Sequence, residues 1–354
     1  MALNKNDLVQ LMKTVAKADP SAPVSYSYNG ESFSYEALNE TLRQELNEYA
    51  GTYSLYRENK NLIFQIVEEV LDDVLPKKVT EAYMQFAEVK TFAQGDKPMF
   101  RRKRDTRSRA KQFITRVGLA GIYEVFKLGP TEDETFEVRT SAIGGAAQIG
   151  FEEFLDGRVD FAEVTKIVMD GMDELIYREI AKALMSSINH LPRANQVAVA
   201  GFDEAAFDRL LSVASAYGTP SIYCTYEFAV KMIPAEGWIS DAMRDEKWAK
   251  GYFANYKGYR VVILPQAFED ETNEKKMIDP GYVWILPTGH DKPVKVAFEG
   301  DTLVQEMHTH DRSREIQVYK KVGVGVITSP DICVYQDTEL LGQMDVMKGF
   351  TNLV

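Results

Sequence analysis

This chain of 354 residues has little of what enzyme and metal sites are usually built from. It contains only two cysteines, Cys224 and Cys333, and four histidines. Two cysteines in a chain of this length favour buried thiols over a disulfide framework. No apolar run is long enough to cross a bilayer, and the first residues lack the continuous apolar stretch of a signal peptide. We therefore expect a cytosolic product without membrane contact.

The sequence also lacks a convincing catalytic constellation. The isolated candidates are His308, His310 and Asp311 as metal ligands, Cys224 with His190 or His290 as a nucleophile pair, and Gly323 with Gly325 as part of a phosphate loop. The first group has no third and fourth ligand nearby, so a polar turn between two strands explains it better. Nothing local arranges the second group, and the third lacks both a further glycine and a following helix. We predict no catalytic residue, no metal site and no cofactor.

The most extended pattern is an amphipathic helix expected from Asp160 to Asn189. Apolar residues recur there at spacings of three and four, which keeps one stripe of the helix apolar. Asp160 suits the N-cap position with Glu163 completing a capping box, Gly171 indicates a bend or a close contact, and Pro192 marks the end. A rod of this length suits an extended subunit better than a compact enzyme. The stripe consists of Phe161, Val164, Ile167, Val168, Met172, Leu175, Ile176, Ile180, Ala183, Leu184 and Ile188.

Residues 1–90 are expected to form a helical arm. Helices are predicted over 3–18, over 34–49 with Ser34 as the cap, and over 59–74 with Pro76 closing the last one. An Asn29-Gly30 pair predicts a hairpin turn within 26–33. Short helices of this kind bury too little surface to fold alone, so we expect the arm to pack on something else, with another subunit as a candidate.

Residues 97–116 form a basic run. They carry nine basic residues and one acidic residue, a local charge of +8, which leaves −20 for the rest of a chain whose net charge is −12. That balance argues against nucleic-acid binding by the whole surface. The run itself has three interpretations: a solvated face, phosphate contacts, or an acidic neighbour in an oligomer. The candidate contact residues are Arg101, Arg102, Lys103, Arg104, Arg107 and Arg109.

Strand-like pieces surround and follow the basic run. They are predicted over 113–117, 122–128 and 136–142, and we interpret the region as an extended hairpin. Gly144, Gly145 and Gly150 are expected to loosen the chain before the long helix.

The second half of the chain mixes helices and strands. Helices are predicted over 203–217, 226–233 and 239–250. Strands are predicted over 197–201, 222–225, 259–264, 282–286, 294–298, 303–307, 315–322 and 332–335. The fold class is α+β, because no regular β-α-β alternation is present.

This order of elements resembles that of tailed-bacteriophage major capsid proteins, whose Hong Kong 97-type fold is shared with bacterial encapsulins. The resemblance covers residues 89–335. Its best local pieces are Ser141-Ala-Ile-Gly-Gly-Ala-Ala-Gln-Ile-Gly150, which leads into the long helix, and Lys257-Gly-Tyr-Arg-Val-Val-Ile-Leu-Pro265, which resembles a strand of the family's axial domain. Some family members cross-link a lysine of the extended loop to an asparagine, but no residue pair here justifies carrying that over.

The resemblance implies a division of the chain into domains. Residues 1–90 would be the helical N-terminal arm, 91–156 the extended loop (E-loop), 157–195 with 299–336 the peripheral domain containing the spine helix, 196–298 the axial domain, and 337–354 a C-terminal tail. The implied function is structural: a major capsid protein that self-assembles as pentamers and hexamers into an icosahedral shell enclosing a double-stranded DNA genome.

The resemblance also implies partners and a location. The partners are further copies of the chain, with scaffolding, portal and decoration proteins, and packaged DNA on the inner surface, as further candidates. The location is the virion, after assembly in the host cytoplasm. Three alternatives stay open: an encapsulin-like nanocompartment shell, a cytosolic α+β enzyme without a recognisable site, and a nucleic-acid-binding module that uses the basic run.

Overall fold

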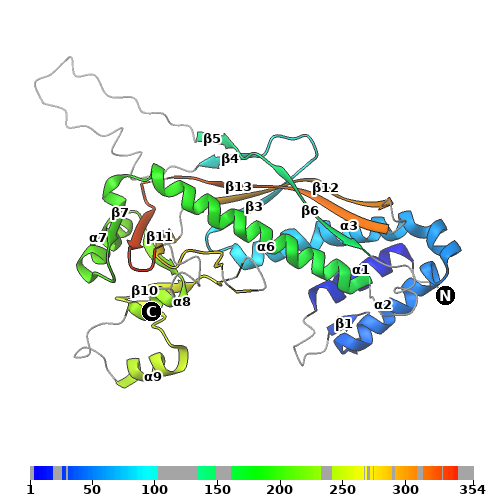
Figure 1. Ribbon diagram of the computed structural model, residues 1–354, viewed down its shortest axis with the longest axis horizontal. Helices are drawn as coiled ribbons and strands as arrows, with labels where there is room; N and C mark the ends of the chain where they lie inside the picture. Colours follow the sequence, from blue (N-terminus) through cyan, green and yellow to red (C-terminus); the bar gives the residue numbers. More distant parts are fainter. Residues whose placement is uncertain are drawn as a thin grey trace, which may run out of the picture. The chain divides into compact units, whose positions relative to one another are not determined.

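The computed structural model divides the chain into two compact units (Figure 1). Unit 1 comprises Met1–Met99, Glu137–Glu179 and Lys295–Gly325, and unit 2 comprises Phe100–Phe136, Ile180–Val294 and Val326–Val354. The residues that the structure describes are 4–18, 26–28, 31–102, 134–148, 161–232, 241–266, 268, 272–273, 275–288, 292–308, 314–328 and 330–341. Within these ranges, no helix is both long and apolar enough to cross a membrane.

Unit 1 begins with three helices that pack on one another: α1 (Lys5–Lys17), α2 (Tyr35–Ala50) and α3 (Tyr53–Tyr83). As predicted, the side chain of Ser34 caps α2, where its Oγ accepts a hydrogen bond from the N–H of Ala37. The expected hairpin strands are β1 (Tyr26–Tyr28) and β2 (Glu31–Phe33), while the turn between them lies outside the described residues. The apolar stripes of the helices are buried at Leu8, Leu11, Met12, Val15, Leu38, Leu42, Leu46, Ile66, Val70 and Leu71. The arm therefore buries its stripes within its own chain, and a further contact with another subunit stays a prediction.

Helix α3 is longer than predicted. It contains 31 residues with Pro76 inside it, whereas we expected Pro76 to end the helix. Proline lacks an N–H group and usually breaks a helix interior. Here Leu75 and Val79 are both buried, and the hydroxyl of Thr80 donates a hydrogen bond to the carbonyl of Pro76. Packing on both sides of the proline keeps the helix continuous.

A four-stranded sheet completes unit 1, in the order β3-β12-β13-β6. Its strands are β3 (Ala87–Phe92), β12 (Val294–His308), β13 (Arg314–Val326) and β6 (Ser141–Gln148). The two strands predicted over 294–298 and 303–307 are one strand, β12. Gly300 has a φ of +68°, which glycine adopts without the penalty that other residues incur. The strand therefore continues through a position where a break was expected.

Strand β6 corrects a second expectation about glycine. Gly144 and Gly145 do not loosen the chain, because they pair in register with Tyr319 and Val318 of β13. A Cβ atom added at Gly144 would lie only 2.8 Å from Cδ1 of Tyr319. Glycine is needed there for close packing of a neighbouring ring, while Gly150 lies outside the described residues. The strand predicted over 136–142 is in fact divided between β5 (Glu134–Glu137) and β6.

The predicted long helix is α6 (Phe161–Ser187), followed by short 3-10 turns at Ile188–His190 and Arg193–Asn195. Asp160 lies outside the described residues. Five predicted stripe residues are buried: Met172, Ile176, Ile180, Leu184 and Ile188. Ile167 and Leu175 were wrongly assigned, since they are 63% and 37% exposed, and Met169 and Tyr177 occupy the buried face instead. A Cβ at Gly171 would meet nothing within 4 Å, so the predicted close contact is absent there.

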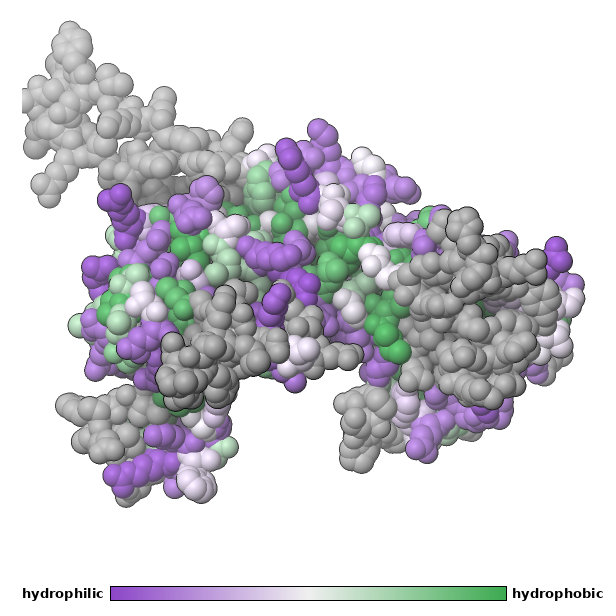
Figure 2. All heavy atoms as spheres, viewed as in Figure 1, coloured by the Kyte–Doolittle hydropathy of each residue, from purple (hydrophilic) through white to green (hydrophobic). Residues whose placement is uncertain are grey.

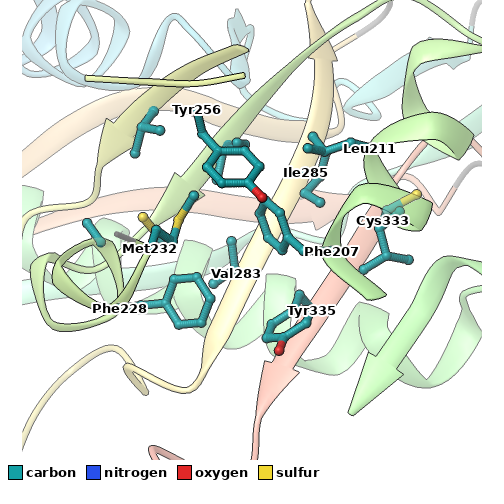
Figure 3. Packing of buried hydrophobic residues seen from close by; sticks show 14 of the residues in the cluster. Phe207, Leu211, Phe228, Met232, Tyr256, Val283, Ile285, Cys333 and Tyr335 are labelled. Atoms are coloured by element: carbon teal, nitrogen blue, oxygen red, sulfur yellow. The ribbon is translucent and has the colours of Figure 1, made fainter. Parts of the chain in front are cut away.

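Unit 2 is organised around a six-stranded mixed sheet in the order β7-β14-β11-β8-β10-β9. The strands are β7 (Gln196–Val199), β14 (Cys333–Asp337), β11 (Tyr282–Thr288), β8 (Thr219–Cys224), β10 (Tyr259–Ile263) and β9 (Asn255–Tyr256). The helices are α7 (Glu204–Ser215), α8 (Tyr226–Lys231) and α9 (Asp241–Lys250). Figure 3 shows Phe207 and Leu211 of α7 and Phe228 of α8 packed with Val283 and Tyr335 of the sheet. These elements agree with the predicted α+β class.

Candidate functional site

The predicted contact residues lie only partly within the described chain. Arg101 and Arg102 end strand β4 (Met99–Arg102), which forms a two-stranded sheet with β5, and Arg101 is exposed. Lys103, Arg104, Arg107 and Arg109 lie outside the described residues. The described part of the basic run therefore ends with a paired strand, and what the run contacts stays a prediction.

The candidate nucleophile and metal ligands do not form a site among the described residues. Cys224 is fully buried, and burial raises the pKa of its thiol to about 12. A thiol with such a pKa is protonated at neutral pH and is a poor nucleophile. His308 ends β12, while His290, His310 and Asp311 lie outside the described residues. No group of three or more histidine, cysteine or carboxylate side chains that could hold a metal occurs in the described part of the chain.

The described side chains do form one concentrated polar site, which we call the α3–β12 cluster: Lys60, Glu68, Asp72, Thr302, Val304, Glu306 and Lys320. At its centre, Lys320 of β13 is 5% exposed, and its Nζ donates hydrogen bonds to Oδ1 of Asp72 at 2.5 Å and to the carbonyl of Gly300 at 2.6 Å. The hydroxyl of Thr302 donates to the same carboxylate oxygen at 2.5 Å. A buried ammonium needs such partners, since burying it unpaired is costly.

The cluster also satisfies the backbone of β12. The N–H of Thr302 donates to Asp72 at 2.9 Å, and the N–H of Val304 donates to Glu68 at 2.9 Å. Four residues along a helix rise about 6 Å, and two residues along a strand rise about 6.7 Å. The distance between Glu68 and Asp72 along α3 therefore matches the distance between Thr302 and Val304 along β12. N–H groups two residues apart point to the same edge of a strand. The carboxylates of α3 therefore cover an edge of β12, and Lys60 extends the contact to Glu306 at 3.4 Å.

Two further ion pairs lie at the opposite end of β12. Lys295 is fully buried and pairs with Glu88 of β3. Burial alone would raise the pKa of Glu88, but hydrogen bonds from Lys295 and Lys90 hold it below the ordinary value. Glu299 accepts hydrogen bonds chiefly from the Thr140 hydroxyl, and also from the backbone N–H of Gly95 and from Nζ of Lys321. These hydrogen bonds lower its pKa. The β3 and β12 strands thus carry charges that are already paired within unit 1.

Unit 2 has a comparable polar centre at the end of β14. The carboxylate of Asp337 accepts hydrogen bonds from Lys231 at 3.0 Å and from the N–H groups of Gly201 and Glu339, each at 2.9 Å. Burial by itself would raise the pKa of Asp337, but these three donors lower it. The hydroxyl of Tyr335 donates to the carbonyl of Gly201 at 2.7 Å. This centre holds the turn before α7 in place.

Sequence reasoning missed the α3–β12 cluster. The spacing of four between Glu68 and Asp72 is visible in the sequence, but the strand residues that they bind lie more than 200 positions away. The α3–β12 cluster holds helix α3 on the sheet of unit 1, and the carboxylates of Glu68 and Asp72 are used in that contact. It can stabilise a preformed subunit.

Comparison with known proteins identifies what kind of subunit this is. The family model described as "SPbeta prophage-derived putative capsid protein YonB" matches residues 7–336. The chain belongs to this capsid protein family. The interpretation of the sequence as a phage capsid protein with a structural, shell-forming role is confirmed at this level. No curated protein sequence matches the chain at a significant level.

Solved structures similar to this chain are distant in sequence. A phage-related protein from Bordetella bronchiseptica is 13% identical over 78% of this chain and 97% of that one, with a TM-score of 0.48. A structure from Mycobacterium phage Che8 is 13% identical over 69% of this chain and 86% of that one, with a TM-score of 0.40. The SrpI encapsulin of Synechococcus elongatus is 10% identical over 75% and 90%, with a TM-score of 0.45. The assignment of this capsid protein rests on the family model.

Proposed function

We propose that this capsid protein is the major shell subunit of a tailed-phage particle of the Hong Kong 97 type. It assembles as pentamers and hexamers into an icosahedral shell that encloses double-stranded DNA. The observation that carries the proposal is the family match over residues 7–336, which includes most of both compact units. The α3–β12 cluster supports it, because a subunit with internally paired charges keeps its shape before and after assembly.

The surface offers apolar groups for contacts between subunits. Figure 2 shows hydrophobic residues exposed among hydrophilic ones on the face in view. Large apolar side chains that are exposed include Ile167, Trp248, Leu303 and Tyr319, with Trp248 exposed by 94%. Tryptophan and tyrosine are enriched where protein surfaces meet. Association of many copies would cover these side chains.

The basic run has a role in this proposal. The E-loop that contains it, residues 91–156, reaches a neighbouring subunit, and Arg101, Arg102 and Arg104 meet acidic side chains there. The rest of the chain carries −20, so a second copy is the nearest supply of negative charge. Each exposed ion pair contributes only about 0–1 kcal/mol, but a shell repeats the contact in every subunit.

Expression of the chain followed by negative-stain electron microscopy tests the proposal. Closed shells or capsomers are the expected result, and a subunit that stays monomeric at all concentrations would contradict it. Shells that contain host protein instead of DNA would indicate an encapsulin-like compartment. Raising the salt from about 0.1 M toward 1 M shortens the Debye length from ~10 Å to ~3 Å and is expected to slow assembly.

A triple charge reversal separates the two uses of the basic run. Replacement of Arg101, Arg102 and Arg104 by glutamate is expected to slow assembly, followed by light scattering, while the subunit stays folded. A control with the same change in charge reverses the exposed residues Lys17, Arg193 and Lys247, and is expected to assemble much faster than the triple variant. Normal assembly of the triple variant with reduced DNA content would instead assign the run to DNA.

A further inference from the structure

The two edges of the unit 1 sheet differ in how they are protected. Strands at the edge of a sheet expose unpaired N–H and C=O groups, and stable monomers cover such edges or place charges on them. On one side, β3 carries Glu88 and Lys90, and the carboxylates of Glu68 and Asp72 cover β12. On the other side, β6 is the last strand of the sheet, and no described strand pairs with its outer edge.

Among the described residues, strand β6 lacks the charges, the proline and the irregular pairing that commonly protect an edge strand. All eight of its residues, Ser141–Gln148, pair with β13, so the strand is regular along its whole length. Its sequence, Ser-Ala-Ile-Gly-Gly-Ala-Ala-Gln, contains no charged residue and no proline. A long, regular and uncharged edge is a template for pairing with another strand.

A second observation concerns the sheet face beside this edge. Tyr319 is 39% exposed, and its ring lies against Gly144, the residue opposite it on β6. Leu303 of β12 is 46% exposed. Since Gly144 has no side chain, an apolar side chain on a strand added beside β6 can reach across it to the ring of Tyr319. The outer backbone edge of β6 and the exposed side chains of Tyr319 and Leu303 are therefore both available for contact with an added strand.

We propose that β6 pairs antiparallel with β6 of a second copy of this chain, about a two-fold axis, which joins two four-stranded sheets into one. This deepens the proposed function and rests on it, because a capsid subunit meets further copies of itself. A two-fold contact places the same strand on both sides, so a charge near the axis would lie beside its own copy. β6 avoids this repulsion in a chain of net charge −12, whereas β3 places a glutamate and a lysine on its edge.

Hydrogen exchange measures the contact directly. In an antiparallel pair, alternate residues direct their N–H groups to opposite sides, so about half of the β6 amides face the open edge. Exchange over 141–148 is compared by mass spectrometry between the free subunit and the associated protein, separated by size. The open-edge amides are expected to exchange at least tenfold more slowly after association.

Two neighbouring proline variants provide a matched pair. Ala146→Pro and Ala147→Pro remove N–H groups that point to opposite edges of β6, so one breaks the ladder with β13 and the other affects only the open edge. The open-edge variant is identified by a melting temperature close to that of the wild type. It is expected to associate at least tenfold more weakly.

The outcomes distinguish this inference from the proposed function. Wild-type shells whose β6 amides exchange as fast as in the free subunit would overturn the inference and leave the proposed function standing. Normal association of the open-edge variant would have the same meaning. Wild-type dimers with protected β6 amides but no shells would support the inference and contradict the function. A wild type that never associates would contradict both.

Discussion

Nζ of Lys320 lies 2.5 Å from Oδ1 of Asp72, although 248 positions separate the two residues in the chain. The contact joins the last long strand of unit 1 to the helix that begins in the N-terminal arm. It closes a loop of sequence that contains more than half of the chain. Its contribution to stability can therefore be measured on the intact chain alone.

Asp72→Asn is expected to lower the free energy of unfolding by about 2–3 kcal/mol. The change keeps the size of the side chain but leaves the buried ammonium of Lys320 without its opposite charge. Urea denaturation followed by circular dichroism gives the value. The double variant Asp72→Asn with Lys320→Met is expected to recover part of the loss, and a single variant as stable as the wild type would show that the pair contributes nothing.

The pH dependence of stability is expected to report on Asp337. Its pKa in the folded protein is lower than the ordinary value of 3.8, so below about pH 5 the unfolded chain takes up a proton first. The stabilisation from this carboxylate is complete above that range and is lost as the pH falls through and below 3.8. Asp337→Asn should flatten the acid limb of the stability curve relative to the wild type. Equal slopes in the two proteins between pH 5 and pH 3 would contradict the assignment.

The two thiols are expected to be unreactive in the folded protein. Burial raises the pKa of Cys224 to about 12, and burial with the nearby charge of Asp331 raises that of Cys333 to about 12. At pH 8 a thiol reagent should label neither residue until urea unfolds the chain, and then both. Rapid labelling of the folded protein would mean that one of the thiols is accessible.

Two substitutions on α6 test which face of the helix is buried. Ile180 is 1% exposed, so Ile180→Asp places a carboxylate in the core at a cost of several kcal/mol. We expect insoluble or unfolded protein. Ile167→Asp makes the same chemical change at a position that is mostly exposed, and should leave the melting temperature within a few degrees of the wild type. Soluble, folded Ile180→Asp would mean that the buried face is wrongly identified.

Features decided by local sequence were predicted well. The Ser34 cap and the helix that follows it depend on neighbouring residues, and the cap is present. The sequence pattern was wrong where distant packing decides the outcome, as with the helix that continues through Pro76 and the strand that continues through Gly300. The α3–β12 cluster was not predicted, because the partners of its carboxylates are backbone N–H groups, which every residue except proline offers.

The continuity of α3 through Pro76 has a mechanical consequence. Helix α3 packs with α1 and α2, and α1 pairs with Glu69 and Asp73 beside the two carboxylates that hold the backbone of β12. A rod fixed in this way acts as a lever, so a load applied to the three-helix bundle is transmitted to the sheet. Displacement of the N-terminal helices and displacement of β12 are therefore expected to occur together, because α3 is bonded to both.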